Sequence, residues 1–398
     1  MESRKNALRS EPFRLLFPLG YFCLVFGLGV WSVDLLGASS EPIRLHATLV
    51  GNGFLFCFSL GILFTEVPAL LRTRSLGMAQ FLLLLITLAA MIGAALGQNV
   101  FYAQAFHFLS MANLAWFLAV RLRTSAAKGH PGPALAFAAA LFSLAGTGLF
   151  LLGEASAVFR GFGSWGADLS LQGYFLLFSV ACLRWKREER AGGHAADGAW
   201  FGIALATLLI SLGLEAVSGH SPYQDGYLRL AYGLRAGWVA YALAKPGRIY
   251  GLLEGQRFPG GLVRAGLLFT FAAYAMTVFR PSGVSLYNHI AFLAGFAWIA
   301  LTAATGLIST RLRQAPRKSA LRILGAGAAS LGAAALLRVS AGQVHAGRGI
   351  LLGAAAVLAL APLFLWAIAY FPLLADPDSR IPLAAEPPTL DPAGKSVS

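Results

Sequence analysis

Long apolar stretches recur along the whole chain, separated by short stretches that contain charged residues, glycine or proline. An apolar stretch of about 18 residues or more is long enough for a helix to cross a bilayer. The pattern therefore predicts an all-α, polytopic membrane protein with about twelve transmembrane helices. We expect these spans near residues 15–37, 44–70, 76–97, 101–121, 133–153, 167–185, 199–217, 225–244, 261–280, 286–308, 319–341 and 347–375.

The connections between the apolar stretches are too short to contain a folded soluble domain. We therefore predict a single membrane domain over residues 15–375, preceded by a cytoplasmic segment at 1–14 and followed by a tail at 376–398. The tail is rich in proline and polar residues, a composition that favours disorder. The first apolar stretch lacks a small-residue cleavage site, so we expect it to remain as a helix.

The composition supports a membrane protein and argues against a soluble one. Hydrophobic residues make up 57% of the chain and charged residues 12%, whereas soluble domains carry about 25% charged residues. A net charge of +14 would suggest nucleic acid in a soluble protein. Here the basic residues lie in short connections, and we expect no nucleic-acid partner. The three cysteines lie in apolar stretches without a paired spacing, which favours small buried side chains over disulfides.

The basic residues also predict how the chain is oriented. If the N-terminus is inside, most of the 31 lysines and arginines fall in the inner segments. An excess of basic residues in cytoplasmic connections is the usual asymmetry of membrane proteins. We therefore expect both termini in the cytoplasm and a lipid bilayer around the spans.

The seven histidines divide between the two sides of this topology. His130 and His194 lie in inner connections, where we expect them to be solvated. The remaining five belong to the outer half, as a metal or haem site at one depth would require: His46, His107, His220, His289 and His345. An isolated histidine at a membrane interface is usually only solvated, and this alternative applies most to His220 and His345.

Three of the outer histidines, His46, His107 and His289, are surrounded by apolar residues. Ionisable groups within a membrane usually have a function, and neutral imidazole is a common ligand of haem iron and copper. His107 and Met111 are four residues apart and share one helix face, which suits copper, although methionine more often serves packing. We keep all four residues, with His345, as candidate metal ligands.

Charged residues within the spans are the remaining candidates. Arg235 lies two to three turns from the outer face, where it needs a partner: a haem propionate, an anion, or an acidic neighbour such as Asp225. We include Arg235 with the candidate cofactor-binding residues. Glu66 lies near the inner end of the second span, and we expect it to pair with Arg72 or Arg74.

The second span carries a recognisable motif. The segment HATLVGNGFLFCFSLGILFTEVPALL resembles the signature helix of the NnrS family, in which a His-led helix runs through Gly-Phe to a Gly-[FI]-Leu-x-Thr-x-Val-Pro ending. The matching residues are His46, Gly53, Phe54, Gly61, Ile62, Leu63, Thr65, Val67 and Pro68. The tenth span is similar to the second His-led helix of the family, with His289, Gly295 and Arg311. The ending WAIAYFPLLADPD and the opening PFRLLFPLGYF also resemble the family.

The resemblance implies a haem- and copper-containing protein of a bacterial cytoplasmic membrane, linked to nitric oxide, nitrosative stress and denitrification. It implies that His46 and His289 are metal ligands and that nitric oxide or a redox partner is bound. Thr48, Leu49 and Val50 stand where the family often has His-Glu-Met, and Arg235 stands where members tend to have a histidine. With fewer ligands for copper, a single haem is the better prediction.

The arrangement is also similar to the core subunit of haem–copper oxidases, which has twelve helices and haem-ligating histidines on the second and tenth. This chain has no His–His pair and no histidine within its sixth to ninth spans, so we expect no binuclear centre. Two other functions stay open: a secondary transporter of a small anion, with Arg235 at its site, and a membrane enzyme or assembly factor that moves haem or copper.

Overall fold

The computed structural model describes residues 10–35, 42–125, 131–191, 198–218, 223–244, 260–312, 318–344 and 348–376. Within these ranges the chain is helical and has no β-strand. Nine helical segments of the described chain are long and apolar enough to cross a membrane. The expectation of an all-α, multi-pass membrane protein is therefore confirmed.

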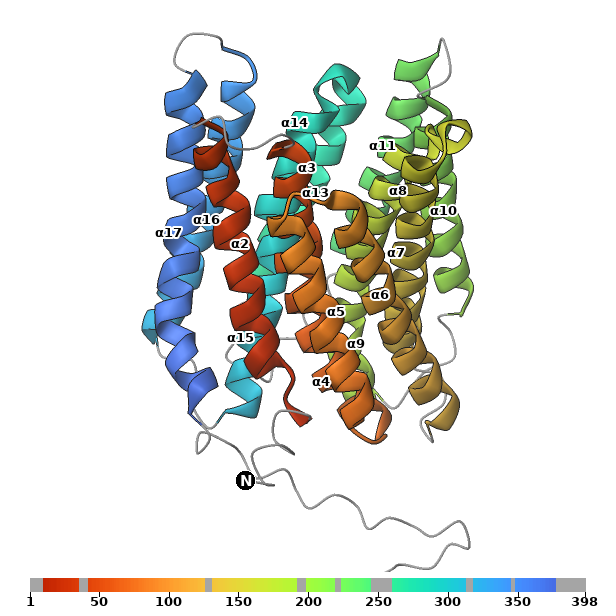
Figure 1. Ribbon diagram of the computed structural model, residues 1–398, viewed down its shortest axis with the longest axis vertical. Helices are drawn as coiled ribbons and strands as arrows, with labels where there is room; N and C mark the ends of the chain where they lie inside the picture. Colours follow the sequence, from red (N-terminus) through yellow and green to blue (C-terminus); the bar gives the residue numbers. More distant parts are fainter. Residues whose placement is uncertain are drawn as a thin grey trace, which may run out of the picture.

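The helices follow the order of the predicted spans, which we number one to twelve along the chain (Figure 1). Three of the spans, the second, sixth and tenth, are composite and change helix type along their length. The segments are α2 (Phe13–Leu35), α3 (Pro42–Ala47), η1 (Thr48–Leu55), α4 (Phe56–Leu71), α5 (Met78–Leu96), α6 (Val100–Thr124), α7 (Pro131–Ala155), η2 (Ala157–Phe159), α8 (Phe162–Asp168), η3 (Leu169–Gly173), α9 (Tyr174–Ala191), α10 (Gly198–Ser218), α11 (Gln224–Ala244), α13 (Gly260–Phe279), η5 (Pro281–Gly283), α14 (Val284–His289), η6 (Ile290–Ala297), α15 (Trp298–Arg311), α16 (Lys318–Ala341) and α17 (Arg348–Ala375).

The composite spans contain π-helical segments: η1 in span two, η3 in span six and η6 in span ten. Such segments have one residue more per turn than an α-helix and are frequent at functional sites. They recur at intervals of four spans. The chain therefore divides into three sets of four spans, each with a π-helical segment in its second span.

The packing follows the same division into sets. In each set the first span packs against the composite second span, and the third packs against the fourth. The fourth span then packs against the first span of the next set, as α6 does on α7 and α11 on α13. Contact between α17 and α2 joins the last span to the first. The remaining nine spans thus form three packed groups of three: spans three to five, spans seven to nine, and spans eleven, twelve and one.

Aromatic side chains join the three composite spans at this centre. The ring of Phe56 in span two lies 4.3 Å from that of Tyr174 and 5.2 Å from that of Phe175, both in span six. The Phe175 ring lies 5.8 Å from that of Phe296 in span ten. Spans two and ten are 83% buried in their apolar windows, against 50% or less in the other long apolar segments.

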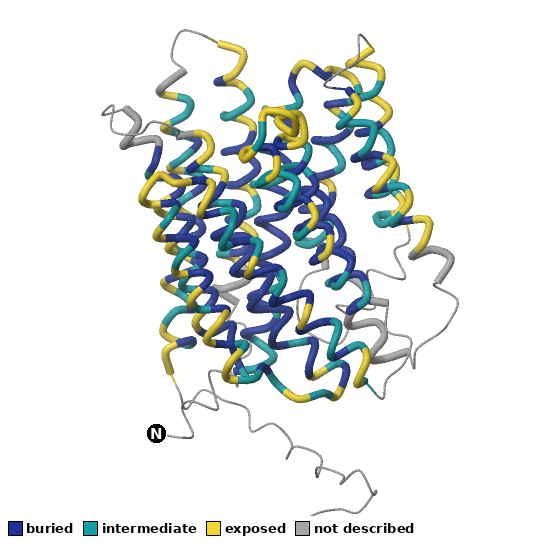
Figure 2. The backbone as a smooth tube through the Cα atoms, turned by 45° about the vertical axis from the view of Figure 1, so that its right-hand side comes forward, coloured by how far each residue is buried: buried dark blue, intermediate teal, exposed yellow. Residues whose placement is uncertain are grey.

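Many exposed positions lie on the outer sides of the bundle (Figure 2). Large hydrophobic side chains are exposed on helices from all three sets, among them Ile86, Trp116, Ile203 and Val357. A soluble protein would not expose so many, whereas hydrocarbon chains solvate them well. The side chains that face outward therefore contact the lipid bilayer.

Two ion pairs lie at the end of the bundle where the described chain begins and ends, and they help to join its spans. Arg14 pairs with Glu11 at 2.6 Å and donates to the carbonyl oxygens of Leu374 and Asp376, so the first and last spans are joined. Glu66 pairs with Arg311 of span ten at 3.1 Å. The prediction that its partner is Arg72 or Arg74 was wrong, because the second span packs against the tenth.

Candidate functional site

His46 lies in the first turns of span two, two residues before the start of the π-helical segment η1. Its Nδ1 atom is 2.9 Å from the carbonyl oxygen of Gly27 on α2. The two helices approach closely at this point, since a Cβ on Gly27 would lie 2.8 Å from Val50. A carbonyl oxygen only accepts, so Nδ1 carries the hydrogen and the lone pair of the neutral ring is on Nε2.

His289 has a similar position in span ten. It is the last residue of α14, and η6 begins at the next residue. Its Nδ1 atom is 2.8 Å from the carbonyl oxygen of Ser285, one turn earlier. The neutral ring again has its lone pair on Nε2.

The two imidazoles and one cation form a group at one end of the bundle. His46 lies close enough to His289 for its charge to be felt there, and Arg338 of α16 lies similarly close to both rings. Histidines that bind metals usually donate their other ring nitrogen to a carbonyl or carboxylate, which fixes the orientation of the ring. The donor set of His46 and His289 therefore fits a metal ion or haem iron ligated through Nε2.

Arg235 lies elsewhere, near the middle of α11, with only 1% of its surface exposed. Its guanidinium forms an ion pair with the Glu215 carboxylate of α10, and its Nη1 donates to Gln172 Oε1 at 2.7 Å. The acidic neighbour of Arg235 is thus Glu215 and not Asp225. The pair supplies the counter-charge that a buried guanidinium requires.

Further hydrogen bonds extend this pair into a network. Tyr232 Oη donates to Glu215 Oε1 at 2.8 Å, and Gln172 Nε2 donates to Asp168 Oδ1 at 3.1 Å. Asn288 Nδ2 donates to Tyr232 Oη at 3.2 Å, which connects the network to the residue that precedes His289. We call this group the Arg235 network, with the members Asp168, Gln172, Glu215, Tyr232, Arg235 and Asn288.

His107 and Met111 are both fully buried on α6. The His107 ring lies 4.3 Å from that of Phe56, and its Nε2 is 3.3 Å from the hydroxyl of Ser143 on α7. No group of three or more histidine, cysteine, aspartate or glutamate side chains that could hold a metal occurs among the described residues. The structure thus brings His46 and His289 together, and the interactions of His107 lie with Ser143 and Phe56.

The other histidines fall outside the part of the chain that the structure describes. These are His130, His194, His220 and the candidate ligand His345. The predicted disordered tail, beyond residue 376, also lies outside it, as does most of the N-terminal segment.

Several polar residues near these sites were not identified from the sequence. Glu215 and Gln172 lie inside apolar stretches, and Asp168 lies at the start of one. A carboxylate or amide within a predicted span is itself a signal, because such groups are costly in lipid without a partner. That signal was present at Glu215, one predicted span before Arg235.

No family model, curated protein or solved structure matches this chain. The resemblance to the NnrS family therefore stays a prediction from the motif residues.

Proposed function

We propose that the chain is a haem-binding protein of the NnrS type in a bacterial cytoplasmic membrane, acting in nitric oxide metabolism or in protection from nitrosative stress. The observation that carries this proposal is the arrangement of His46 and His289. They head the two most buried apolar spans, interact with each other, and each present Nε2 as the basic nitrogen.

The proposal assigns a role to three side chains. His46 and His289 supply the ligand nitrogens, and their backbone partners Gly27 and Ser285 hold the rings in orientation. Arg338 supplies positive charge beside both rings, which favours an anionic group such as a haem carboxylate. A bound haem would supply an iron centre that exchanges electrons and binds nitric oxide. Copper has no comparable donor set and remains a weaker prediction.

An absorption spectrum of the purified protein tests this function. We expect a Soret band that shifts on reduction and again when nitric oxide is added. Gly27→Val should weaken the band, because the larger side chain pushes α2 away from η1 and removes the carbonyl partner of His46. Gly29→Val is the matched control, since a Cβ there has no neighbour within 4 Å. A colourless, iron-free preparation contradicts the proposal.

A secondary transporter of a small anion is the second candidate. It is favoured by two buried donors without a hydrogen-bond partner among the described residues: Arg235 Nε and the hydroxyl of Tyr274. The Tyr274 ring lies 5.6 Å from that of Tyr232 in the Arg235 network. An anion would have to compete with Glu215 for the guanidinium, which makes this function the weaker proposal. Uptake of labelled nitrate into proteoliposomes that is lost in Arg235→Met and kept in His46→Ala would favour transport.

A further inference from the structure

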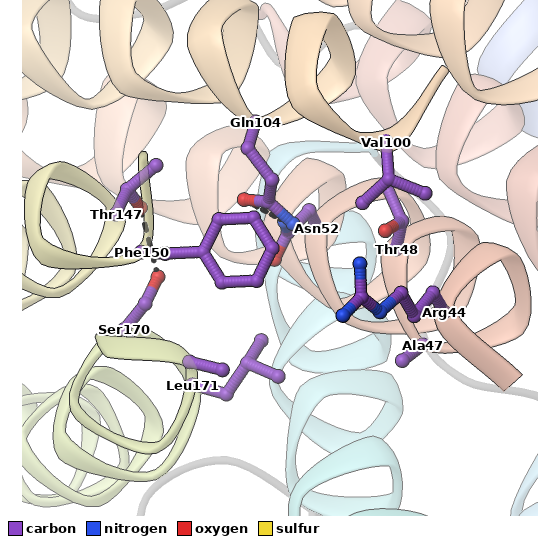
Figure 3. Close-up of a pocket in the computed structure, with 11 residues that line it drawn as sticks. Arg44, Ala47, Thr48, Asn52, Val100, Gln104, Thr147, Phe150, Ser170 and Leu171 are labelled. Atoms are coloured by element: carbon purple, nitrogen blue, oxygen red, sulfur yellow. Dashed lines mark hydrogen bonds between the residues drawn. The ribbon is translucent and has the colours of Figure 1, made fainter. Parts of the chain in front are cut away.

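A cavity of about 120 Å³ lies between spans two, four, five and six, on the side of η1 that faces α6 and α7 (Figure 3). Most of its wall is apolar, and its polar side chains come from all four spans, among them Asn52, Gln104, Thr147 and Ser170. Neither the haem proposal nor the Arg235 network uses these residues. The cavity is much larger than the 10–15 Å³ or so that one water molecule requires.

The rim of the cavity reaches the surface of the molecule. Arg44, at the start of span two, lines the cavity, and about half of its side chain is exposed. It pairs with Glu154 at the end of α7 at 3.3 Å, and the Glu154 side chain is also partly exposed. Two charged, solvated groups therefore stand where the cavity opens, at the end of the bundle where α3 begins (Figure 1).

Inside the cavity a buried acceptor lacks a partner. Asn52 is 3% exposed, and its Nδ2 donates to Gln104 Oε1 at 2.9 Å. Its Oδ1 has no hydrogen-bond partner among the described residues. A buried oxygen left without a hydrogen bond is unfavourable, and a water molecule in the cavity would supply the missing donor.

A chain of hydroxyl groups runs from the cavity into the protein. The hydroxyls of Thr147 and Ser170, on the cavity wall, lie 3.1 Å apart, and Ser170 Oγ lies 3.1 Å from Ser143 Oγ. Ser143 Oγ lies 3.3 Å from His107 Nε2. All four side chains are at least 96% buried. A hydroxyl group both donates and accepts, so each link in this chain can pass a proton in either direction.

We propose that the cavity is a hydrated port and that Ser170 and Ser143 carry protons between its water and His107. In one transfer, a hydronium ion in that water gives a proton to Ser170 Oγ, Ser170 releases its own to Ser143, and Ser143 releases its own to His107 Nε2. The imidazole becomes imidazolium, and the hydronium ion becomes water. Reversal of the three steps restores both, so no oxidant or reductant takes part.

The other surroundings of His107 offer no second path for a proton among the described residues. The ring is fully buried and packs edge-on against Phe56, and its Nδ1 has no hydrogen-bond partner among the described residues. Among the described residues, Ser143 is therefore the polar group that can exchange a proton with the ring. The relay does not require bound haem, so its test is independent of the test of the haem proposal.

Hydrogen exchange at the His107 ring tests the relay. Protein labelled with ¹⁵N-histidine in lipid vesicles is transferred to D₂O, and the decay of ring N–H signals is followed by solid-state NMR. The His107 signal is assigned by its absence in His107→Gln. We expect exchange in the unmodified protein to slow at least tenfold in Ser143→Ala and Ser170→Ala, and to recover in Ser143→Thr.

Thr277→Val is the matched control, because the Thr277 hydroxyl is buried and bonds only within its own helix. Equal exchange rates in Ser143→Ala and the unmodified protein would overturn the relay, as would a His107 ring that never exchanges. A change of melting temperature in each variant reports any loss of folding separately.

Labelling of an introduced cysteine tests the port. In a background with Cys23, Cys57 and Cys182 replaced by alanine, Thr147→Cys should react with a small charged methanethiosulfonate reagent. Ser59→Cys, fully buried beside Tyr174, should not react. Protection of Thr147→Cys equal to that of Ser59→Cys would contradict a hydrated cavity.

Discussion

Spans two, six and ten each contain a π-helical segment, but they differ in the ionisable side chain that lies near its start. In spans two and ten a histidine lies near the start of the π-helical segment: His46 two residues before η1 and His289 directly before η6. In span six the corresponding residue is Asp168, which precedes η3. The first and third sets of spans thus present imidazoles, and the second set presents a carboxylate.

The surroundings of these residues differ for a physical reason. A neutral imidazole needs no counter-charge, and one backbone carbonyl orients each ring. A carboxylate in lipid needs partners. In the second set Gln172 donates to Asp168, and the Arg235 guanidinium bonds to Gln172 and pairs with Glu215. The second set therefore contains a charged network, while the histidines of the other two sets bond through Nδ1 to backbone carbonyls.

Replacement of the cation should have the largest effect on stability. Arg235→Met leaves Glu215 without its counter-charge, and removal of one partner of a buried ion pair costs about 3–5 kcal/mol. Chemical unfolding in detergent micelles measures this loss. Arg229→Met, on the same helix with an exposed side chain, should change stability little. Equal losses in both variants would mean that the network does not stabilise the second set.

Close packing of the second set is the next point to test. A Cβ on Gly166 would lie 2.5 Å from backbone atoms of Gly146 and Phe150, which cannot give way as a side chain can. Gly166→Ala should therefore destabilise the protein by about 1–3 kcal/mol. Gly213→Ala, in the same set with no neighbour within 4 Å, should leave the melting temperature unchanged or slightly higher. Similar shifts in the two variants would contradict this packing.

The ion pair that joins the first and third sets should have the smallest effect. Glu66 and Arg311 are partly exposed, with side-chain exposures of 26% and 15%. Solvent screening reduces such a pair to about 0.2–1 kcal/mol. We expect Glu66→Gln to lower the unfolding free energy by no more than this, with less effect at high salt. A loss as large as that of Arg235→Met would show that the two pairs are equally shielded.

Hydrophobic patterning predicted the spans well, because a bilayer requires about 20 apolar residues per helix whatever the neighbours are. The second span was expected at 44–70 and runs from Pro42 to Leu71, and the tenth was expected at 286–308 and ends at Arg311. The π-helical segments were not predicted, because the apolar sequence does not reveal a local change of helix type.

Partners across the bundle were the main part that sequence could not predict. Glu66 was assigned to arginines six and eight residues away and pairs with Arg311, 245 positions along the chain. The hydroxyl chain that ends at His107 likewise combines residues of α6, α7 and η3. Such contacts depend on how the helices pack and rotate, which the order of apolar residues along one helix does not specify.

The haem content of single-histidine variants tests the contrast between the sets most directly. A pyridine haemochrome assay on purified protein measures haem per chain. The account predicts haem in the unmodified protein, loss in His46→Ala and in His289→Ala, and retention in Asp168→Asn and His107→Gln. Absence of haem from the unmodified protein, or full haem in both alanine variants, would contradict the assignment of spans two and ten as the metal-binding pair.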